Sequence, residues 1–280
     1  QYFFVYIMFF MNPGFYIGKL HIAWYGVLIA FGMLVAILLC IPDVKKRDIK
    51  MDEMISLALW VIPFSIIGAR LYYVIFYTHD YTFAEMFRIW DGGMAIYGGV
   101  IAGALTIIIW CVIKKKSIAG FMDVIAPSLI IAQSIGRWGN FINQEAYGYL
   151  VENPSLQWFP YAVYIEADAS WHLATFFYES MWNLIGFAIL MVILYFVKNK
   201  GAVVASYLVW EGIGRAMIEG LRTDSLYIGS SGIRVSQLLS IFMIVGGLVW
   251  IGFIIYKDIK QKKQNGGDNE TRQRKKQTGK

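Results

Sequence analysis

Ionisable and amide side chains gather in the run GRWGNFINQEAYG at 136–148, directly after an apolar segment long enough to cross a bilayer. They are the guanidinium of Arg137, the amides of Asn140 and Asn143, and the carboxyl group of Glu145. Such groups are costly at membrane depth and are usually retained there for a substrate, a partner or a proton relay. The run therefore predicts a functional site near one face of a membrane.

The apolar segment 202–221 carries a second charged pattern that ends just beyond it. Its members alternate in sign at spacings of four, four and three residues: Glu211, Arg215, Glu219 and Arg222. At these spacings all four side chains are expected to share one helical face. Part of the pattern is structural, because Glu and Arg four residues apart neutralise each other. We expect Arg215 and Glu219 to act at the site and Glu211 to be a structural partner.

The elements that position these residues are predicted to be membrane helices. Hydrophobic residues make up 58% and charged residues only 16% of the chain, which excludes an ordinary water-soluble domain. Apolar runs of about 20 residues recur, and each could span a hydrocarbon core of roughly 30 Å as a helix. We expect an all-α polytopic membrane protein with seven transmembrane helices, at 22–41, 54–76, 94–113, 119–136, 180–197, 202–221 and 235–256.

Basic residues predict the orientation of these helices, because Lys and Arg accumulate in short cytoplasmic loops. Eighteen of the 25 Lys and Arg residues fall in three loops, near 45–50, 114–116 and 198–200, and in the tail from 257 onward. With seven spans, this places the N-terminus outside and the C-terminus in the cytoplasm. The net charge of +6 is then a signal of topology and needs no nucleic-acid partner.

Six of the seven other basic residues are arginines, and this topology places all seven in the outer half of the membrane or outside it. A guanidinium stays charged when partly desolvated, and its planar fork of donors fits a phosphate group. A single arginine could instead snorkel to the interface or pair with a nearby acid. That alternative is weaker for four arginines expected at one level: Arg70, Arg137, Arg215 and Arg222.

Composition divides the rest of the chain. We expect residues 1–10 to be an upstream extension or a cloning remnant, because Met11 is a plausible natural start. Residues 11–260 form the membrane domain, with an ordered external cap at about 149–179 that is too polar to span. Residues 261–280 form a basic tail that is expected to be disordered and to lie on anionic lipid.

No metal or cofactor site is predicted. The three histidines, His21, His79 and His172, show no ligand spacing. Cys40 and Cys111 are expected near the cytoplasmic ends of their spans, where thiols stay reduced. Any thiol chemistry at the outer face must therefore come from a substrate.

The run 136–148 resembles the signature of the bacterial prolipoprotein diacylglyceryl transferase family. The resemblance covers about residues 11–260 and includes short motifs: Trp24-Tyr25-Gly26, Gly68-Ala69-Arg70, Asp91-Gly92-Gly93, Tyr97-Gly98-Gly99, Asp123 with Ala126-Pro127, and Gly214-Arg215 through Glu219 to Arg222-Thr223-Asp224. One departure is Tyr97, because many members of the family have histidine at that position. It puts in doubt any mechanism in which a histidine there is the universal base.

The resemblance implies an enzyme that transfers the diacylglyceryl group of phosphatidylglycerol to the lipobox cysteine of a preprolipoprotein. The transfer forms a thioether, releases glycerol phosphate and is the first step of lipoprotein maturation. The implied partners are phosphatidylglycerol, lipobox-containing preprolipoproteins and the lipid bilayer, and no cofactor is implied. The implied location is the bacterial cytoplasmic (inner) membrane, which the chain crosses several times, with the active site toward the outer face.

The resemblance also implies roles for individual residues. Arg137 and Arg215 would hold the phosphate and headgroup and stabilise the charge that grows on the leaving group. Asn140 and Asn143 would orient these groups through hydrogen bonds, and Gly148 would keep the loop close. The substrate-binding set is completed by three further residues: Tyr25, Arg70 and Arg222.

Three residues are candidates for the base that activates the thiol: Glu145, Glu219 and Tyr97. A free thiol with a pKa of about 8.5 is only a few per cent ionised near neutral pH, so a base or a cationic field must help. A phenol is a poor base near neutral pH. We therefore expect electrostatic activation by the arginines, with Tyr97 as a hydrogen-bonding or orienting group.

Two other classes of protein fit part of the pattern. A transporter or channel for an anionic solute would also line a membrane cavity with arginine, but it is expected to have paired repeats with broken helices at the midplane. No repeat relates the halves of this chain, and its charges gather toward one face. A non-catalytic lipid-binding or assembly protein is the second alternative, and an assay of the reaction separates it from the enzyme.

Overall fold

The computed structural model describes residues 14–18, 20–77, 86, 88, 93–223 and 234–278. The described chain is mostly helical, and its β-strands form two short hairpins. It divides into two compact units. The larger unit comprises residues 1–40 and 123–280, and the smaller unit comprises residues 41–122.

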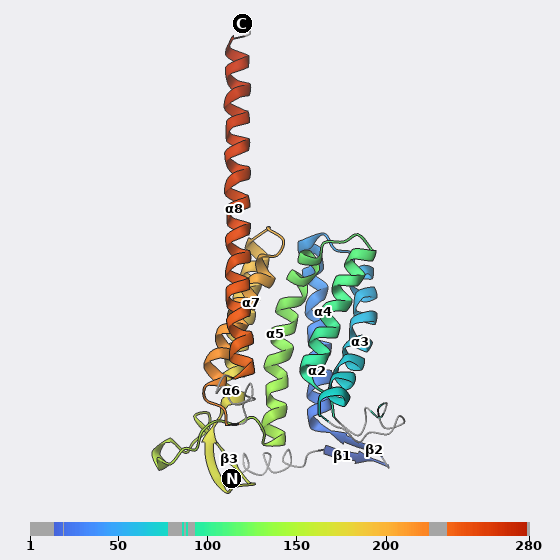
Figure 1. Cartoon of the computed structure of the whole chain (residues 1–280), viewed down its shortest axis with the longest axis vertical. Helices are drawn as coiled ribbons and strands as arrows, with labels where there is room; N and C mark the ends of the chain where they lie inside the picture. The colour runs from blue at the N-terminus through green and yellow to red at the C-terminus, as the bar shows by residue number, and fades with distance from the viewer. Residues whose placement is uncertain are drawn as a thin grey trace. The chain divides into compact units, whose positions relative to one another are not determined.

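The smaller unit is built on α3 (Met51–Tyr77) and α4 (Ile96–Ile113), with a short 3-10 helix, η1 (Val44–Arg47), before them. α3 and α4 lie side by side (Figure 1). They approach closely because a Cβ at Gly98 would clash with the carbonyl oxygen of Gly68. Glycine at both positions lets the two backbones pack directly, as small residues do between membrane helices.

Five helices form the helical part of the larger unit: α2 (Trp24–Asp43), α5 (Ile118–Asn143), α6 (Thr175–Phe196), α7 (Ala202–Glu219) and α8 (Val235–Thr278). α7 packs along α8 (Figure 1). Gly212 on α7 and Gly247 on α8 leave room for the backbone and side chains of the facing helix. The pair therefore forms a closely packed support for the residues on α7.

Reciprocal hydrogen bonds join α5, α6 and α7. Between α5 and α6, the Ser134 hydroxyl donates to the Ser180 carbonyl at 2.8 Å, and the Ser180 hydroxyl also lies 2.9 Å from the Ser134 carbonyl. Between α6 and α7, the rings of Trp182 and Trp210 stack with centroids 4.3 Å apart. Each indole N–H donates to the backbone carbonyl of the other tryptophan at 3.1 Å. These contacts fix how far each helix is displaced along its neighbour.

Asp123 on α5 fixes the start of α7. Its buried carboxylate accepts hydrogen bonds from the backbone N–H groups of Gly201 at 2.8 Å and of Val203 and Val204 at 3.0 Å. The first N–H groups of a helix have no partner within the helix and carry partial positive charge. The carboxylate supplies both the acceptor and the negative charge, so it sets the depth of α7 against α5.

A cap follows α5 in the larger unit. It contains a 3-10 helix, η4 (Pro154–Leu156), and the antiparallel hairpin of β3 (Ala162–Ile165) and β4 (Ser170–Leu173). Residues of β3 pack with Phe176 of α6 and Trp138 of α5 in one apolar cluster. A second hairpin, β1 (Gly14–Ile17) and β2 (Leu20–Ala23), precedes α2.

Each segment predicted to cross the membrane forms a helix. Six of the described helices are long and apolar enough to do so. The exception is α7, which carries Glu211, Arg215 and Glu219 among its 18 residues. The structure therefore supports an all-helical, multi-pass membrane protein, whereas seven spans and their orientation stay a prediction.

Several helix ends differ from the sequence prediction. α5 continues to Asn143 instead of ending at 136, and α6 begins at Thr175, within the segment predicted as cap. α8 runs to Thr278 through the polar residues predicted as a disordered tail. An ion pair of 3.2 Å between Asp258 and Lys262, one helical turn apart, is of the kind that supports such a helix.

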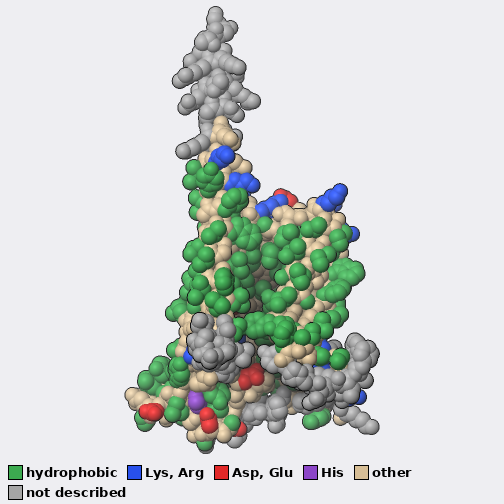
Figure 2. All heavy atoms as spheres, viewed as in Figure 1, with side chains coloured by type: hydrophobic (Ala, Val, Ile, Leu, Met, Phe, Trp, Pro, Cys, Tyr) green, Lys and Arg blue, Asp and Glu red, His purple; other side chains and the backbone are tan. Residues whose placement is uncertain are grey.

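In the view of Figure 2, apolar side chains cover most of the described surface of the larger unit's helices. On α8 they include Phe242, Val249 and Phe253, and each of the three is exposed. A continuous exposed apolar surface of this kind requires an apolar partner. Lipid is the partner that suits helices of this length.

Candidate functional site

The last turns of α5 carry three of the predicted site residues: Arg137, Asn140 and Asn143. The helix thus continues beyond 136, the predicted end of this span. The helix ends in a Schellman motif, in which the N–H groups of Gln144 and Glu145 donate to the carbonyls of Phe141 and Asn140 at 3.1 and 3.0 Å. Gln144 takes the left-handed conformation at this end (φ 51°), a position that usually calls for glycine or asparagine.

Glu145 is held by the two asparagines. The Asn140 amide donates to the Glu145 carboxylate at 3.0 Å, and the Asn143 amide does so at 3.5 Å. The residues predicted to orient a substrate therefore lie together with one of the candidate bases. The carboxylate is oriented by the helix end that carries the amides.

Glu179 is the centre of an ion cluster. Its carboxylate pairs with Arg137 of α5, and the same oxygen lies 3.1 Å from the Arg215 guanidinium of α7. The Glu179 side chain is 6% exposed, whereas those of Arg137 and Arg215 are 19% and 24% exposed. The carboxylate is thus enclosed, and both arginines keep part of their surface open. This brings together the two arginines predicted to bind phosphate.

Glu219 lies at the end of α7 beside this cluster. Its buried carboxylate is 3.5 Å from Arg215, a long ion pair, and that oxygen has no close hydrogen-bond donor among the described residues. The Glu219 backbone carbonyl accepts a hydrogen bond from Arg234, which also donates to the Tyr149 hydroxyl at 3.3 Å. Three charged side chains therefore meet where α7 ends.

Arg222 does not share the helical face of Arg215, so that part of the sequence prediction is wrong. α7 ends at Glu219, where the chain turns at Gly220. Arg222 instead forms an antiparallel bridge with Gly148. The three-residue spacing from Glu219 predicts a shared face only where the helix continues, and here it does not.

Gly148 occupies a place with no room for a side chain. A Cβ there would lie 2.7 Å from the Leu173 side chain and 2.9 Å from the Leu221 carbonyl oxygen. Tyr25 is placed in a similar way, since its ring packs where a side chain on Gly139 would lie. α2 therefore brings the predicted Tyr25 against the same end of α5 that carries Arg137.

Two predicted site residues, Arg70 and Tyr97, lie in the smaller unit. Arg70 is buried and donates to the backbone carbonyls of Met86 at 3.1 Å and Gly93 at 2.9 Å. It therefore ties the segment before α4 to α3. Tyr97 lies in the first turn of α4, with its ring near that of Tyr72. Their membership of the substrate site stays a prediction.

Sequence reasoning missed two residues of the larger unit. It placed Glu179 at the edge of the cap, and it set His172 aside because no ligand spacing was present. A usable signal for Glu179 was charge balance, since two arginines expected at membrane depth require a nearby acid. His172 hydrogen-bonds to the carbonyl of Gly148 at 2.9 Å, a contact that no local pattern indicates.

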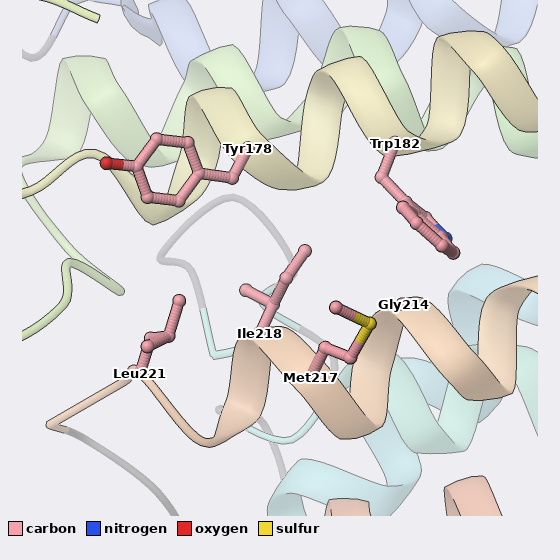
Figure 3. Close-up of a pocket in the computed structure, with 6 residues that line it drawn as sticks. All are labelled: Tyr178, Trp182, Gly214, Met217, Ile218 and Leu221. Atoms are coloured by element: carbon pink, nitrogen blue, oxygen red, sulfur yellow. The ribbon is translucent and has the colours of Figure 1, made fainter. Parts of the chain in front are cut away.

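A cavity of about 460 Å³ opens between α6 and α7 (Figure 3). Its lining is almost entirely apolar: Tyr178, Trp182, Gly214, Met217, Ile218 and Leu221. In Figure 3 the side chain of Ile218 points from α7, and that of Leu221 from the loop after it, toward α6, which carries Tyr178. Gly214 and Tyr178 directly precede Arg215 and Glu179, so the cavity lies at the same level of α6 and α7 as the ion cluster, although successive residues of a helix face different directions.

The arrangement suits an anion with an apolar tail. Each guanidinium has five N–H donors in a fixed fork, and contacts with one or two carboxylate oxygens leave several for another acceptor. Among the described residues, no group of three His, Cys, Asp or Glu side chains could hold a metal ion. In this part of the structure, the charged groups of the site are arginine and carboxylate side chains.

Comparison with known proteins gives a consistent result. Residues 13–253 match the family described as prolipoprotein diacylglyceryl transferase. The chain is 42% identical over 259 residues to phosphatidylglycerol–prolipoprotein diacylglyceryl transferase 1 of Clostridium perfringens, covering 90% of this chain and 98% of that protein. It is 43% identical over 251 residues to the Streptococcus agalactiae transferase (88% and 95% covered) and 44% identical over 250 residues to that of Listeria innocua (87% and 88% covered).

The first testable prediction concerns Glu179→Gln. The amide keeps the size of the side chain but leaves Arg137 and Arg215 without their shared counter-ion. Removing one partner of a buried pair costs up to about 3–5 kcal/mol, so the apparent Tm in detergent should fall clearly. Glu152→Gln, an exposed cap residue, is the control and should be nearly silent. Equal melting temperatures for the two variants would mean that the cluster does not hold the helices together.

Proposed function

The chain belongs to the prolipoprotein diacylglyceryl transferase family, and from this premise we propose that it transfers the diacylglyceryl group of phosphatidylglycerol to the lipobox cysteine of preprolipoproteins. The cysteine sulfur attacks a carbon of the lipid's glycerol, and the bond from that carbon to the phosphate oxygen breaks. The products are a thioether-linked diacylglyceryl protein and glycerol phosphate. The thiol proton passes to a base.

The observation that carries the proposal is that Arg137 and Arg215 both pair with the carboxylate of Glu179. The reaction places new negative charge on the departing phosphate, and preorganised donors stabilise such charge most effectively. Two guanidinium groups fixed before the lipid arrives need no reorganisation during the reaction. Their partly exposed side chains leave donors free for a phosphodiester.

The hydrogen-bonded group around Glu145 supports a role in orienting the headgroup. Asn140 and Asn143 present amides at the end of α5, one turn and two turns beyond Arg137. Gly148 keeps the following loop close to the cap, and Arg222 bridges to it. We assign this group, with Tyr25 and Arg70, to substrate binding.

We assign thiol activation to the field of the arginines, with the proton passing to a carboxylate. Glu145 and Glu219 are the two candidate bases in the larger unit, and each already contacts a site residue. A cationic field stabilises the thiolate over the thiol and so raises its reactive fraction. We assign Tyr97 an orienting role through its hydroxyl.

The apolar cavity between α6 and α7 suits the hydrocarbon part of the lipid (Figure 3). A diacylglycerol carries its acyl chains close to the reacting carbon, so they must leave the ion cluster at once. The cavity lies at the level of Arg215 and Glu179 along α6 and α7 and has no charged side chain in its lining. We propose that it accepts an acyl chain of the substrate.

The proposed setting is a bacterial cytoplasmic membrane, crossed seven times, with the site toward its outer face. α7 completes the seven spans despite its charges, because Arg215 pairs with Glu179 and Glu219. Paired charges cost less in a membrane than single ones. The N-terminus would then lie outside, and the basic loops and α8 tail would lie in the cytoplasm.

A reconstituted transfer reaction tests the function. Purified protein is given phosphatidylglycerol and a lipobox peptide, and mass spectrometry follows the peptide while free glycerol phosphate is measured in parallel. The enzyme should produce a thioether-linked diacylglyceryl peptide and glycerol phosphate in equal amounts. A transporter or a lipid-binding protein would produce neither, and that result would refute the proposal.

Arg137→Lys tests whether the planar fork of this residue holds the phosphate. Lysine keeps the charge opposite Glu179, so the fold should persist, but it cannot place two parallel donors on one phosphate. Losing a preorganised donor costs about 2.7–4 kcal/mol of barrier, or roughly two to three decades in rate. Arg88→Lys, on an exposed residue, is the matched control and should transfer normally. Full activity in folded Arg137→Lys would make Arg137 a packing residue.

Labelling of introduced cysteines tests the orientation. Both natural cysteines are buried, which keeps background labelling low. In intact cells, Cys at position 115 or 198 should be protected from a membrane-impermeant thiol reagent, whereas Cys at position 155 in the cap should react. Labelling in the opposite pattern would place the cap and the site in the cytoplasm and would contradict the proposed reaction at the outer face.

A further inference from the structure

His172 makes more polar contacts than its place in a short cap hairpin requires. Its side chain is only 8% exposed. Nδ1 lies 2.9 Å from the Gly148 carbonyl oxygen, and Nε2 lies 2.9 Å from both the Asp168 carboxylate and the Ser170 hydroxyl. The ring also rests against Tyr147, with centroids 4.6 Å apart. Every edge of the imidazole is therefore engaged.

The partners of His172 define which of its nitrogens donates to Gly148. A carbonyl oxygen only accepts, so Nδ1 must carry the proton that bonds to Gly148. On the other side of the ring, Nε2 lies between the Asp168 carboxylate and the Ser170 hydroxyl. These two contacts fix the orientation of the ring, so Nδ1 stays directed at the Gly148 carbonyl.

Gly148, whose carbonyl bonds to His172, is held by hydrogen bonds on both of its backbone polar groups. The Gly148 N–H donates to the Leu173 carbonyl at 3.0 Å, while its carbonyl accepts from His172. Tyr149, the next residue, donates to the Leu221 carbonyl at 3.1 Å. Gly148 also forms the bridge with Arg222. One residue of the signature loop is thus tied both to the cap and to the segment that follows α7.

The strand that carries His172 leads directly into the ion cluster. α6 begins shortly after β4, and its first residue, Thr175, donates to the Ala146 carbonyl at 2.6 Å. Glu179 lies one turn further along the same helix. The stretch from His172 to Glu179 therefore hydrogen-bonds to the loop that follows Glu145. It also carries the carboxylate shared by the two arginines.

We propose that His172 is a positioning residue of the transferase, which holds the signature loop in register with the arginine cluster. The proposal rests on the proposed function and extends it to a residue outside the predicted site. The hydrogen bond from Nδ1 to the Gly148 carbonyl does the positioning, and Asp168 and Ser170 orient the ring for it. His172 does not touch the reacting atoms.

Two amide substitutions separate this role from a general contribution to folding. In His172→Asn the amide nitrogen takes the position of Nδ1 and can still donate to Gly148. In His172→Gln the amide reaches the position of Nε2, so it retains the contact with Asp168 but loses the one with Gly148. We expect His172→Asn to retain most of kcat and His172→Gln to lose about three- to tenfold, the loss typical of one hydrogen bond.

Hydrogen exchange at the backbone amides of 146–150 gives a second readout that does not depend on transfer. It should be faster in His172→Gln than in the native protein and nearly unchanged in His172→Asn. Glu152→Gln, an exposed cap variant, is the control for both measurements. If the native protein showed no transfer activity, the proposed function would be refuted. Hydrogen exchange would still test whether His172 holds Gly148.

The result that overturns the proposal is an equal effect of the two variants on kcat and on exchange, because the position of the donor would then be irrelevant. If His172→Gln does not fold, Asp168→Asn takes its place, since Asp168 is 43% exposed and its loss should leave the fold intact. It should lower kcat several-fold and change KM for the lipid less, because the ring is then held less firmly in the orientation that bonds to Gly148. An unchanged kcat in Asp168→Asn would equally overturn the proposal.

Discussion

The larger unit depends on one carboxylate shared by two guanidinium groups. Glu179 pairs with Arg137 from α5 and with Arg215 from α7, so three helices must meet at one enclosed oxygen. The Ser134–Ser180 and Trp182–Trp210 contacts join the same helices and hold the same register. Electrostatics decides which side chains meet, and these neutral hydrogen bonds keep them there.

The positive and negative charges of this cluster largely neutralise each other. Removing one partner of a buried ion pair costs several kcal/mol, whereas forming the pair adds little net free energy of folding. The cluster therefore contributes more to the specific arrangement of the helices than to their stability. The exposure is uneven, since Glu179 is enclosed while both arginines remain partly open. An anion that reaches the arginines therefore finds donors without having to displace the carboxylate. In the proposed function, the apolar space at the same level of α6 and α7 takes the tail of that anion.

Composition predicts most of the helices, because long apolar runs have few other uses, and charges at membrane depth single out Arg137 and Arg215, which the structure brings together. The exact ends of the helices could not be predicted. α5 continues through Arg137 and ends with Gln144 in a left-handed conformation, where no glycine marks the end. Glu179 and His172 were missed because their partners are distant in sequence, and pairings of that kind appear only when the chain is folded.

The capping of α7 by Asp123 has a consequence for the order in which the chain is assembled. A segment with Glu211, Arg215 and Glu219 gains little by leaving the aqueous channel of a translocon for lipid alone. Its two main counterparts, Asp123 for its first N–H groups and Glu179 for Arg215, are both synthesised earlier. In the proposed topology α5 and α6 therefore enter the membrane first and provide a receptor for the incoming helix. The polarity that the proposed reaction requires of α7 also makes its insertion depend on helices that are already in place.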